Sequence, residues 1–252
     1  MEIVYWIFIL YLLLYEPIFG YRDFQKFKKT VHTKGNEKIK YYYKIIISLW
    51  VPTLIILGFI LFTEISFEQI GLKTPTINTV TLGAMTSYIL LALGALYMCL
   101  VLYYIIGYKF SEKIRQNLTK KKTEGWEKSV VSPILPVSKE EKKVWNYVSL
   151  TAGITEEIIY RGFLIFVLSS LFPNLSIWIV ILFAALLFGL GHTYQGFWSG
   201  VFRTTLFGVL FSSLYIILDS IIPLIVLHFL VDYIAKLGEN EQVNNETVHS
   251  YK

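Results

Sequence analysis

The chain alternates long apolar runs with shorter polar segments that are mostly basic. Residues 45–62, 74–108 and 162–202 contain no Asp, Glu, Lys or Arg. A helix that crosses a bilayer needs about 20 predominantly apolar residues. The pattern therefore predicts an all-α polytopic membrane protein.

Seven membrane-spanning helices are predicted from these runs and the breaks between them. Turn-forming residues interrupt the apolar pattern at 172–174, 191–196 and 219–223. The predicted spans are residues 3–19, 45–62, 82–107, 148–170, 175–191, 197–218 and 221–235. No basic segment precedes the first run and no small-residue cleavage site follows it, so we expect a retained helix rather than a cleaved signal.

Composition supports a membrane class and excludes several others. The chain is 55% hydrophobic and 16% charged, whereas soluble domains contain about 25% charged residues. A single cysteine, Cys99, excludes a disulfide framework and any multi-cysteine metal site. These features leave a helical protein whose main surroundings are the lipid bilayer.

The net charge of +5 comes mainly from two basic segments. Residues 22–44 contain eight Lys/Arg against two acids, and 109–143 contain ten against five. Basic loops stay cytoplasmic, so we expect an outside amino terminus and a cytoplasmic carboxyl terminus. The charge is a signal of topology, and no nucleic-acid partner is expected. Between the basic segments, residues 67–73 form a short amphipathic stretch that we expect at the outer interface.

Few ionisable residues interrupt the last apolar region, residues 144–235. They are Glu156, Glu157, Arg161, His192, Arg203, Asp219, His228 and Asp232. Each such group costs about 2.5–3.5 kcal/mol on insertion scales, so those that persist pair with one another, line a watery cavity or take part in chemistry. A cluster of this kind predicts a site.

The spacing of these residues predicts how they are arranged. Glu157 and Arg161 are four residues apart with the acid first, the favourable order for an ion pair on one helix face. Glu156, rotated by about 100°, has no obvious local partner. His228 and Asp232 are also four residues apart and are expected to face the same way.

The order of the predicted spans puts all these groups in the cytoplasmic half of the bilayer. We therefore expect one cytoplasm-facing, water-accessible polar cavity between the helices that carry them. Arg203 is expected to line this cavity, and Asp219 to end a helix at the opposite surface.

Three motifs resemble those of the CAAX-protease and bacteriocin-processing (CPBP, or Abi) family of intramembrane proteases. They are Glu-Glu-x-x-x-Arg at 156–161, Phe-x-x-x-His at 188–192 and His-x-x-x-Asp at 228–232. Residues 144–237 would then be a catalytic helical core. It follows an N-terminal membrane region, 1–143, with three helices and two basic cytoplasmic loops, and precedes a short polar tail, 238–252.

The resemblance implies a glutamate-dependent endopeptidase and a role for each site residue. Glu156 would be the general base that activates water, helped by His192, and Glu157 with Arg161 would support it. His228 and residue 232 would stabilise the oxyanion. An ionised aspartate accepts hydrogen bonds but cannot donate one as asparagine does, so Asp232 must be protonated or must orient His228.

Other interpretations of the same residues stay open. Zinc bound by His192, His228 and Glu156 is a minority alternative to a cofactor-free site. A non-enzymatic immunity or scaffold protein that binds a peptide, and a proton-coupled transporter, are the alternative functions. For the enzyme we expect a bacterial plasma-membrane location and a peptide or membrane-protein substrate from bacteriocin, pheromone or CAAX-type processing. The oligomeric state is left open.

Overall fold

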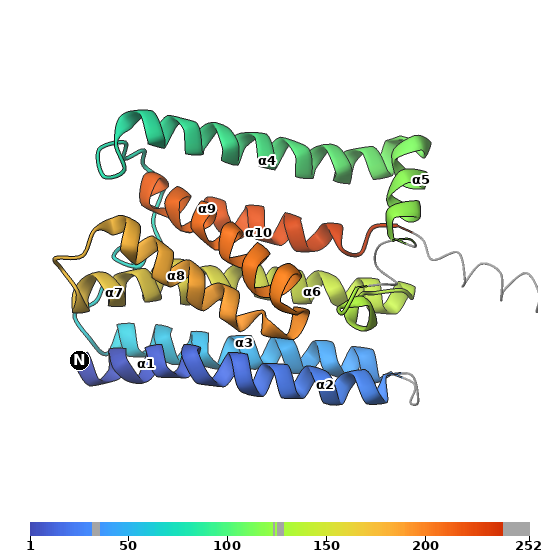
Figure 1. Ribbon diagram of the computed structural model, residues 1–252, viewed down its shortest axis with the longest axis horizontal. Coiled ribbons are helices and arrows are strands. Elements are labelled where there is room, and N and C mark those ends of the chain that lie inside the picture. The colour runs from blue at the N-terminus through green and yellow to red at the C-terminus, as the bar shows by residue number, and fades with distance from the viewer. Residues whose placement is uncertain (32–35, 123, 125–128, 239–252) are drawn as a thin grey trace, which may run out of the picture.

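The computed structural model describes residues 1–31, 36–122, 124 and 129–238, and within these ranges it contains helices and no β-strand. All but the first residue of the predicted polar tail lies outside the described residues, as do His32, Trp126 and His249. The predicted all-α architecture is confirmed for the described part of the chain. Figure 1 shows the helices packed side by side in an elongated bundle.

The N-terminal half contributes three long helices and one short one. The first is continuous through α1 (Glu2–Leu14), the π-helical turn η1 (Tyr15–Gly20) and α2 (Tyr21–Thr30). It is followed by α3 (Glu37–Leu61), α4 (Ala84–Phe110) and α5 (Glu112–Lys121).

The C-terminal half contains the helices that carry the predicted motifs. After the 3-10 turn η3 (Ser132–Ile134), a continuous helix runs through α6 (Lys139–Glu156), the π-helical η4 (Glu157–Leu164) and α7 (Ile165–Leu171). Then come α8 (Ile177–Gly191), the turns η5 (Thr193–Gln195) and η6 (Phe197–Phe202), α9 (Arg203–Leu218) and α10 (Ile222–Ile234). Ser138 begins α6 with a capping box completed by Glu141, which satisfies backbone N–H groups of the first turn.

Four helices are long and apolar enough to cross a membrane by length and composition. They are Glu2–Thr30, Glu37–Leu61, Ala84–Phe110 and Phe197–Leu218. Two shorter apolar helices, Ile177–Gly191 and Ile222–Ile234, correspond to the fifth and seventh predicted spans. The fourth predicted span lies within α6, η4 and α7. The hydropathy of this continuous helix is lowered by the charged residues at 139–143 and by Glu156, Glu157 and Arg161.

One segment differs from its prediction. The basic segment 22–44 is not a loop in its described part, because α2 and the first turns of α3 continue the neighbouring helices through it. The stretch 67–73 forms turns, in which Ile70 is fully buried and Gly71 accepts a backbone hydrogen bond from Ile221. Gly71 has a φ of 75° and lies directly under the Tyr215 ring, a position that only glycine occupies without strain.

The motif-bearing helices pack in the middle of the bundle. In Figure 1, α1 to α3 lie along one side, α4 along the opposite side, and α6 to α10 between them. Gly153 brings α6 against the backbone of α10, and Gly189 brings α8 against the Val201 backbone of η6 and the Thr205 side chain of α9. Small residues at such contacts let helix backbones approach closely. The central helices are thereby held at close range, with their polar side chains between them.

Candidate active site

A buried ion pair lies in η4, where the central helix changes from α to π. Glu157 is 0% and Arg161 1% exposed, and Arg161 Nη1 donates to Glu157 Oε1 at 2.8 Å. The guanidinium also lies over the Phe188 ring, with its carbon 4.1 Å from the ring centroid. The predicted pairing of Glu157 with Arg161 is confirmed. Single π-helical turns inside α-helices are frequent at functional sites.

His228 on α10 joins this pair to the other carboxylates. Its Nδ1 is 2.7 Å from Glu157 Oε1, and because an ionised carboxylate only accepts, Nδ1 carries the proton. Its Nε2 is 3.7 Å from Glu156 Oε2 and 3.8 Å from Asp232 Oδ2. Glu157 therefore fixes the orientation of the imidazole, and Nε2 faces the remaining two acids.

Glu156 ends α6. Its Oε2 is shielded from solvent and has no hydrogen-bond partner among the described residues, although the side chain as a whole is 13% exposed. The expectation that Glu156 has no partner on its own helix is correct; the neighbouring group is His228, from another helix. A buried carboxylate oxygen without a partner can accept a hydrogen bond from water or substrate.

His192 is held at the end of α8 by its own helix. Its Nδ1 donates to the Phe188 backbone oxygen at 2.8 Å, so in the neutral ring Nε2 is an acceptor. The Phe188 ring packs edge-on against both histidines, with centroids 4.8 Å from His192 and 6.3 Å from His228. Phe188 is thus the spacer between the two imidazoles.

A cavity of about 550 Å³ connects these groups, and we call it the site cavity. Its polar lining includes the side chains of Glu156, His192, Gln195, Arg203, His228 and Asp232, which come from α6, α9, α10 and the end of α8 with the turn that follows it. Asp232 is 34% exposed here. Arg203 lines this cavity, and His228 and Asp232 face the same way, as their four-residue spacing predicts.

Tyr194 and Gln195 were not predicted as site residues. Both line the site cavity, and Gln195 Nε2 donates to the Tyr194 hydroxyl at 3.0 Å. The sequence feature that could have identified them is the run of three polar residues, Thr193-Tyr194-Gln195, at the end of an apolar helix. Within the part of the chain that the structure describes, no three His, Cys, Asp or Glu side chains are grouped so that they could hold a metal ion.

The fold and this cluster define a class of protein: an all-helical membrane protein with a carboxylate–histidine site between its helices. One comparison finds a family to which part of the chain is similar. Residues 143–234 match the model of the family described as Type II CAAX prenyl endopeptidase Rce1-like. The matched segment contains all six predicted site residues, and it confirms the resemblance to the CAAX-protease family of membrane proteases. Neither the curated proteins nor the solved structures yielded a match to the chain.

Proposed function

We propose that the protein is an intramembrane endopeptidase that hydrolyses a peptide bond with a water activated by Glu156. The observation that supports this most is the unpartnered, buried Glu156 oxygen in one cavity with two histidines. A base beside a water and a donor aimed at the developing oxyanion are the two parts that peptide hydrolysis requires.

The reaction then uses the chain's own groups in order. Glu156, assisted by the His192 Nε2 lone pair, takes a proton from water as the water oxygen bonds to the scissile carbonyl carbon. His228, as an imidazolium, keeps both ring protons: Nδ1–H donates a hydrogen bond to Glu157, and Nε2–H donates one to the oxyanion. Collapse of the tetrahedral intermediate breaks the C–N bond, and Glu156 returns its proton to the leaving amine.

Glu157, Arg161 and Asp232 act as supporting residues in this scheme. Arg161 compensates the Glu157 charge, and Glu157 in turn holds His228 through Nδ1. Asp232, 3.8 Å from His228 Nε2, stabilises the imidazolium rather than donating to the oxyanion. This role fits an ionised aspartate.

The proposal includes seven spans in a bacterial plasma membrane, with the amino terminus outside and the site cavity facing the cytoplasm. One arrangement supports this orientation. In Figure 1, the same end of the bundle contains α5, the start of α6, the end of α2 and the start of α3. The described parts of both basic segments therefore lie at that end, as cytoplasmic basic segments would. Substrates are membrane-associated peptides or proteins, from bacteriocin, pheromone or CAAX-type processing.

A comparison of peptides in cells tests the activity and identifies the substrate. Membrane and secreted fractions from cells with the wild-type protein are compared with those from cells carrying Glu156→Ala. We expect a peptide that accumulates uncut in the variant. Identical peptide profiles, together with unimpaired protection of Glu156→Ala cells against a peptide toxin, would instead support the non-enzymatic immunity function.

A further inference from the structure

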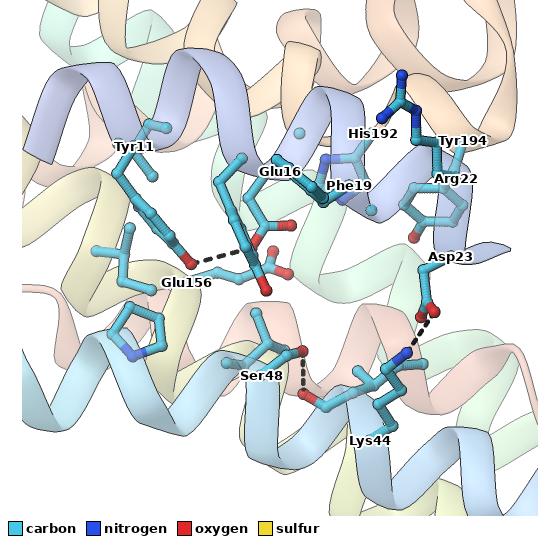
Figure 2. Close-up of a pocket in the computed structure, with 18 of the residues that line it drawn as sticks. Tyr11, Glu16, Phe19, Arg22, Asp23, Lys44, Ser48, Glu156, His192 and Tyr194 are labelled. Carbon is cyan, nitrogen blue, oxygen red and sulfur yellow. Dashed lines mark hydrogen bonds and ion pairs between the residues drawn. The ribbon is translucent and has the colours of Figure 1, made fainter.

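The first helix brings another carboxylate to the site. Glu16, in η1, lines a second pocket of about 410 Å³ that also contains Glu156, Tyr160 and His192. We call it the window pocket. Figure 2 shows the side chains of Glu16 and Glu156 both reaching into it. Glu16 lies outside the matched residues 143–234.

The local structure fixes Glu16 against the end of α8. Pro17 follows it in the π-helical turn, and its backbone oxygen accepts a hydrogen bond from Thr193 Oγ1 at 3.1 Å. Gly191 faces the same turn, because a Cβ built there would be 3.9 Å from Glu16 Cβ. Glu16 is therefore anchored beside the residue that precedes His192.

The charge of Glu16 is not compensated within the described part of the chain. The carboxylate accepts a long hydrogen bond from the Tyr11 hydroxyl, 3.4 Å away, and has no ion pair there. Arg22, Lys26 and Lys44 also line the window pocket, but none of them forms an ion pair with Glu16 among the described residues, and Lys44 pairs with Asp23 (Figure 2). Carboxylates in membrane helices almost always pair with another group or line a watery cavity, so the Glu16 carboxylate in this pocket can accept a cationic group of a bound molecule.

The window pocket lies between the first helix and α3. The two helices touch through Tyr5 and Phe59 on one side of it, and through the stacked rings of Phe27 and Tyr41 on the other. Between these contacts the pocket is lined by Ser48 and Pro52 of α3. A peptide that passes between the two helices enters a pocket that is lined by both Glu16 and Glu156.

We propose that Glu16 binds a lysine or arginine side chain of the peptide substrate and so selects basic sequences next to the cleaved bond. This inference rests on the proposed function and names a substrate class for it. A desolvated carboxylate interacts with a cation much more strongly than one in water. A neutral residue at that substrate position leaves the carboxylate unpaired and binds less tightly.

Binding of matched peptides to detergent-purified protein tests the proposal. The protein carries Glu156→Gln so that the peptides stay intact. The probes are fluorescent leucine-rich decapeptides with a single lysine at successive positions, and the same peptides with norleucine there. We expect at least one lysine peptide to bind about tenfold more tightly than its norleucine counterpart.

Three further variants complete the test. Glu16→Gln is expected to abolish the lysine preference, and Glu16→Lys to transfer it to peptides with glutamate at that position. Glu2→Gln, on the same helix but outside the pocket, keeps the wild-type preference. Equal binding of lysine and norleucine peptides, or a preference that survives Glu16→Gln, overturns the proposal. Cleavage of the same peptides by protein with Glu156 intact is scored separately, so failure of the enzymatic function is distinguishable from failure of the Glu16 subsite.

Discussion

At the scale of single residues, the site depends on Glu157 accepting from two partners. One oxygen, Oε1, is 2.8 Å from Arg161 Nη1 and 2.7 Å from His228 Nδ1. Arg161 is the largest fully buried side chain among the described residues. Removing one member of such a buried network leaves an uncompensated charge, which costs much more than the network contributes over an apolar alternative.

Arg161→Met tests this network. It removes the buried cation that pairs with Glu157, so we expect a loss of about 3–5 kcal/mol in the free energy of unfolding. The readout is the unfolding transition in detergent. Arg203→Met is the matched control, because Arg203 is exposed and lines the cavity without an ion pair among the described residues. A change below about 1 kcal/mol for Arg161→Met contradicts the account.

The sequence predicted the pairs within one helix but not the contacts between helices. Glu157 with Arg161 and His228 with Asp232 follow from four-residue spacing, which places both side chains on one face. The bond from His228 to Glu157 depends on α10 lying against α6 at Gly153, and no periodicity contains that information. Glu16 was not predicted as a site residue for the same reason. A single acid near the end of a predicted span has the sequence pattern of an interfacial residue, and only the contacts between helices bring it to the site.

At the scale of elements, close backbone contacts position the site helices. Gly162 in η4 faces the turn at 67–73: a Cβ built there would lie 2.7 Å from the Ile70 backbone oxygen. Both segments are fully buried at this point. The turn therefore supports the π-helical segment that carries Glu157 and Arg161.

Gly162→Ala is expected to destabilise the protein by about 1–3 kcal/mol, because the Ile70 backbone has to move. Gly58→Ala is the control on α3, where a Cβ meets nothing within 4 Å, and there alanine is expected to add up to about 1 kcal/mol through helix propensity. Both are measured by thermal unfolding in detergent. Equal midpoints for the two variants would rule out the tight contact.

A buried lysine at the end of α5 predicts a pH dependence of stability. Lys122 is 6% exposed, and its Nζ is 3.4 Å from the backbone oxygens of Pro136 and Gly238. Burial, followed by the charges of Lys142 and Lys38, lowers the pKa of Lys122 to about 8 from 10.5. The unfolded chain holds this proton more tightly, so stability is lower below pH 8 and rises as the pH increases from 8 toward 10.5.

Lys122→Met is expected to remove the increase in stability with pH that comes from the deprotonation of Lys122. The measurement is the difference in unfolding midpoint between wild type and variant across pH 7 to about 10. Titrating groups that both proteins share contribute equally to the two midpoints, so their effect drops out of the difference. Lys120→Met, two residues away in an exposed position, keeps the wild-type slope. A slope unchanged by Lys122→Met contradicts the lowered pKa.

Helix existence was predictable and helix ends were not. All seven predicted spans contain helix, because long apolar runs determine where helices form. The ends differ most where basic residues continue a helix out of the apolar run, as α3 does by beginning at Glu37 rather than at residue 45. Hydropathy detects the part of a helix inside the lipid, whereas capping and packing decide where it stops.

At the scale of the whole molecule, the distribution of charge gives the bundle two different ends. Asp219, where α9 ends in a left-handed residue, pairs with Lys73 at 2.6 Å, and this end contains few other charges. The opposite end holds α5 and the basic parts of α2 and α3 (Figure 1). The expectation that Asp219 ends a helix is confirmed.

Cysteine labelling tests the proposed orientation in the membrane. Because Cys99 is the one cysteine of the chain, Cys99→Ser gives a cysteine-free background. In this background Glu68→Cys is expected to react with a membrane-impermeant maleimide in intact cells. Lys113→Cys is expected to react only after permeabilisation. Both positions are exposed, so the opposite pattern would show an inverted topology.

The most direct test of the central claim is the rate of peptide cleavage by purified protein with and without the Glu156 carboxylate. The substrate is the peptide identified in the cell comparison, and the assay includes a chelator. We expect wild type to cleave it, Glu156→Gln to lose about 10²–10⁴-fold in kcat, and Glu2→Gln to retain full activity. Wild-type rates from Glu156→Gln, or activity that disappears on chelation and returns with zinc, would contradict a glutamate-activated water.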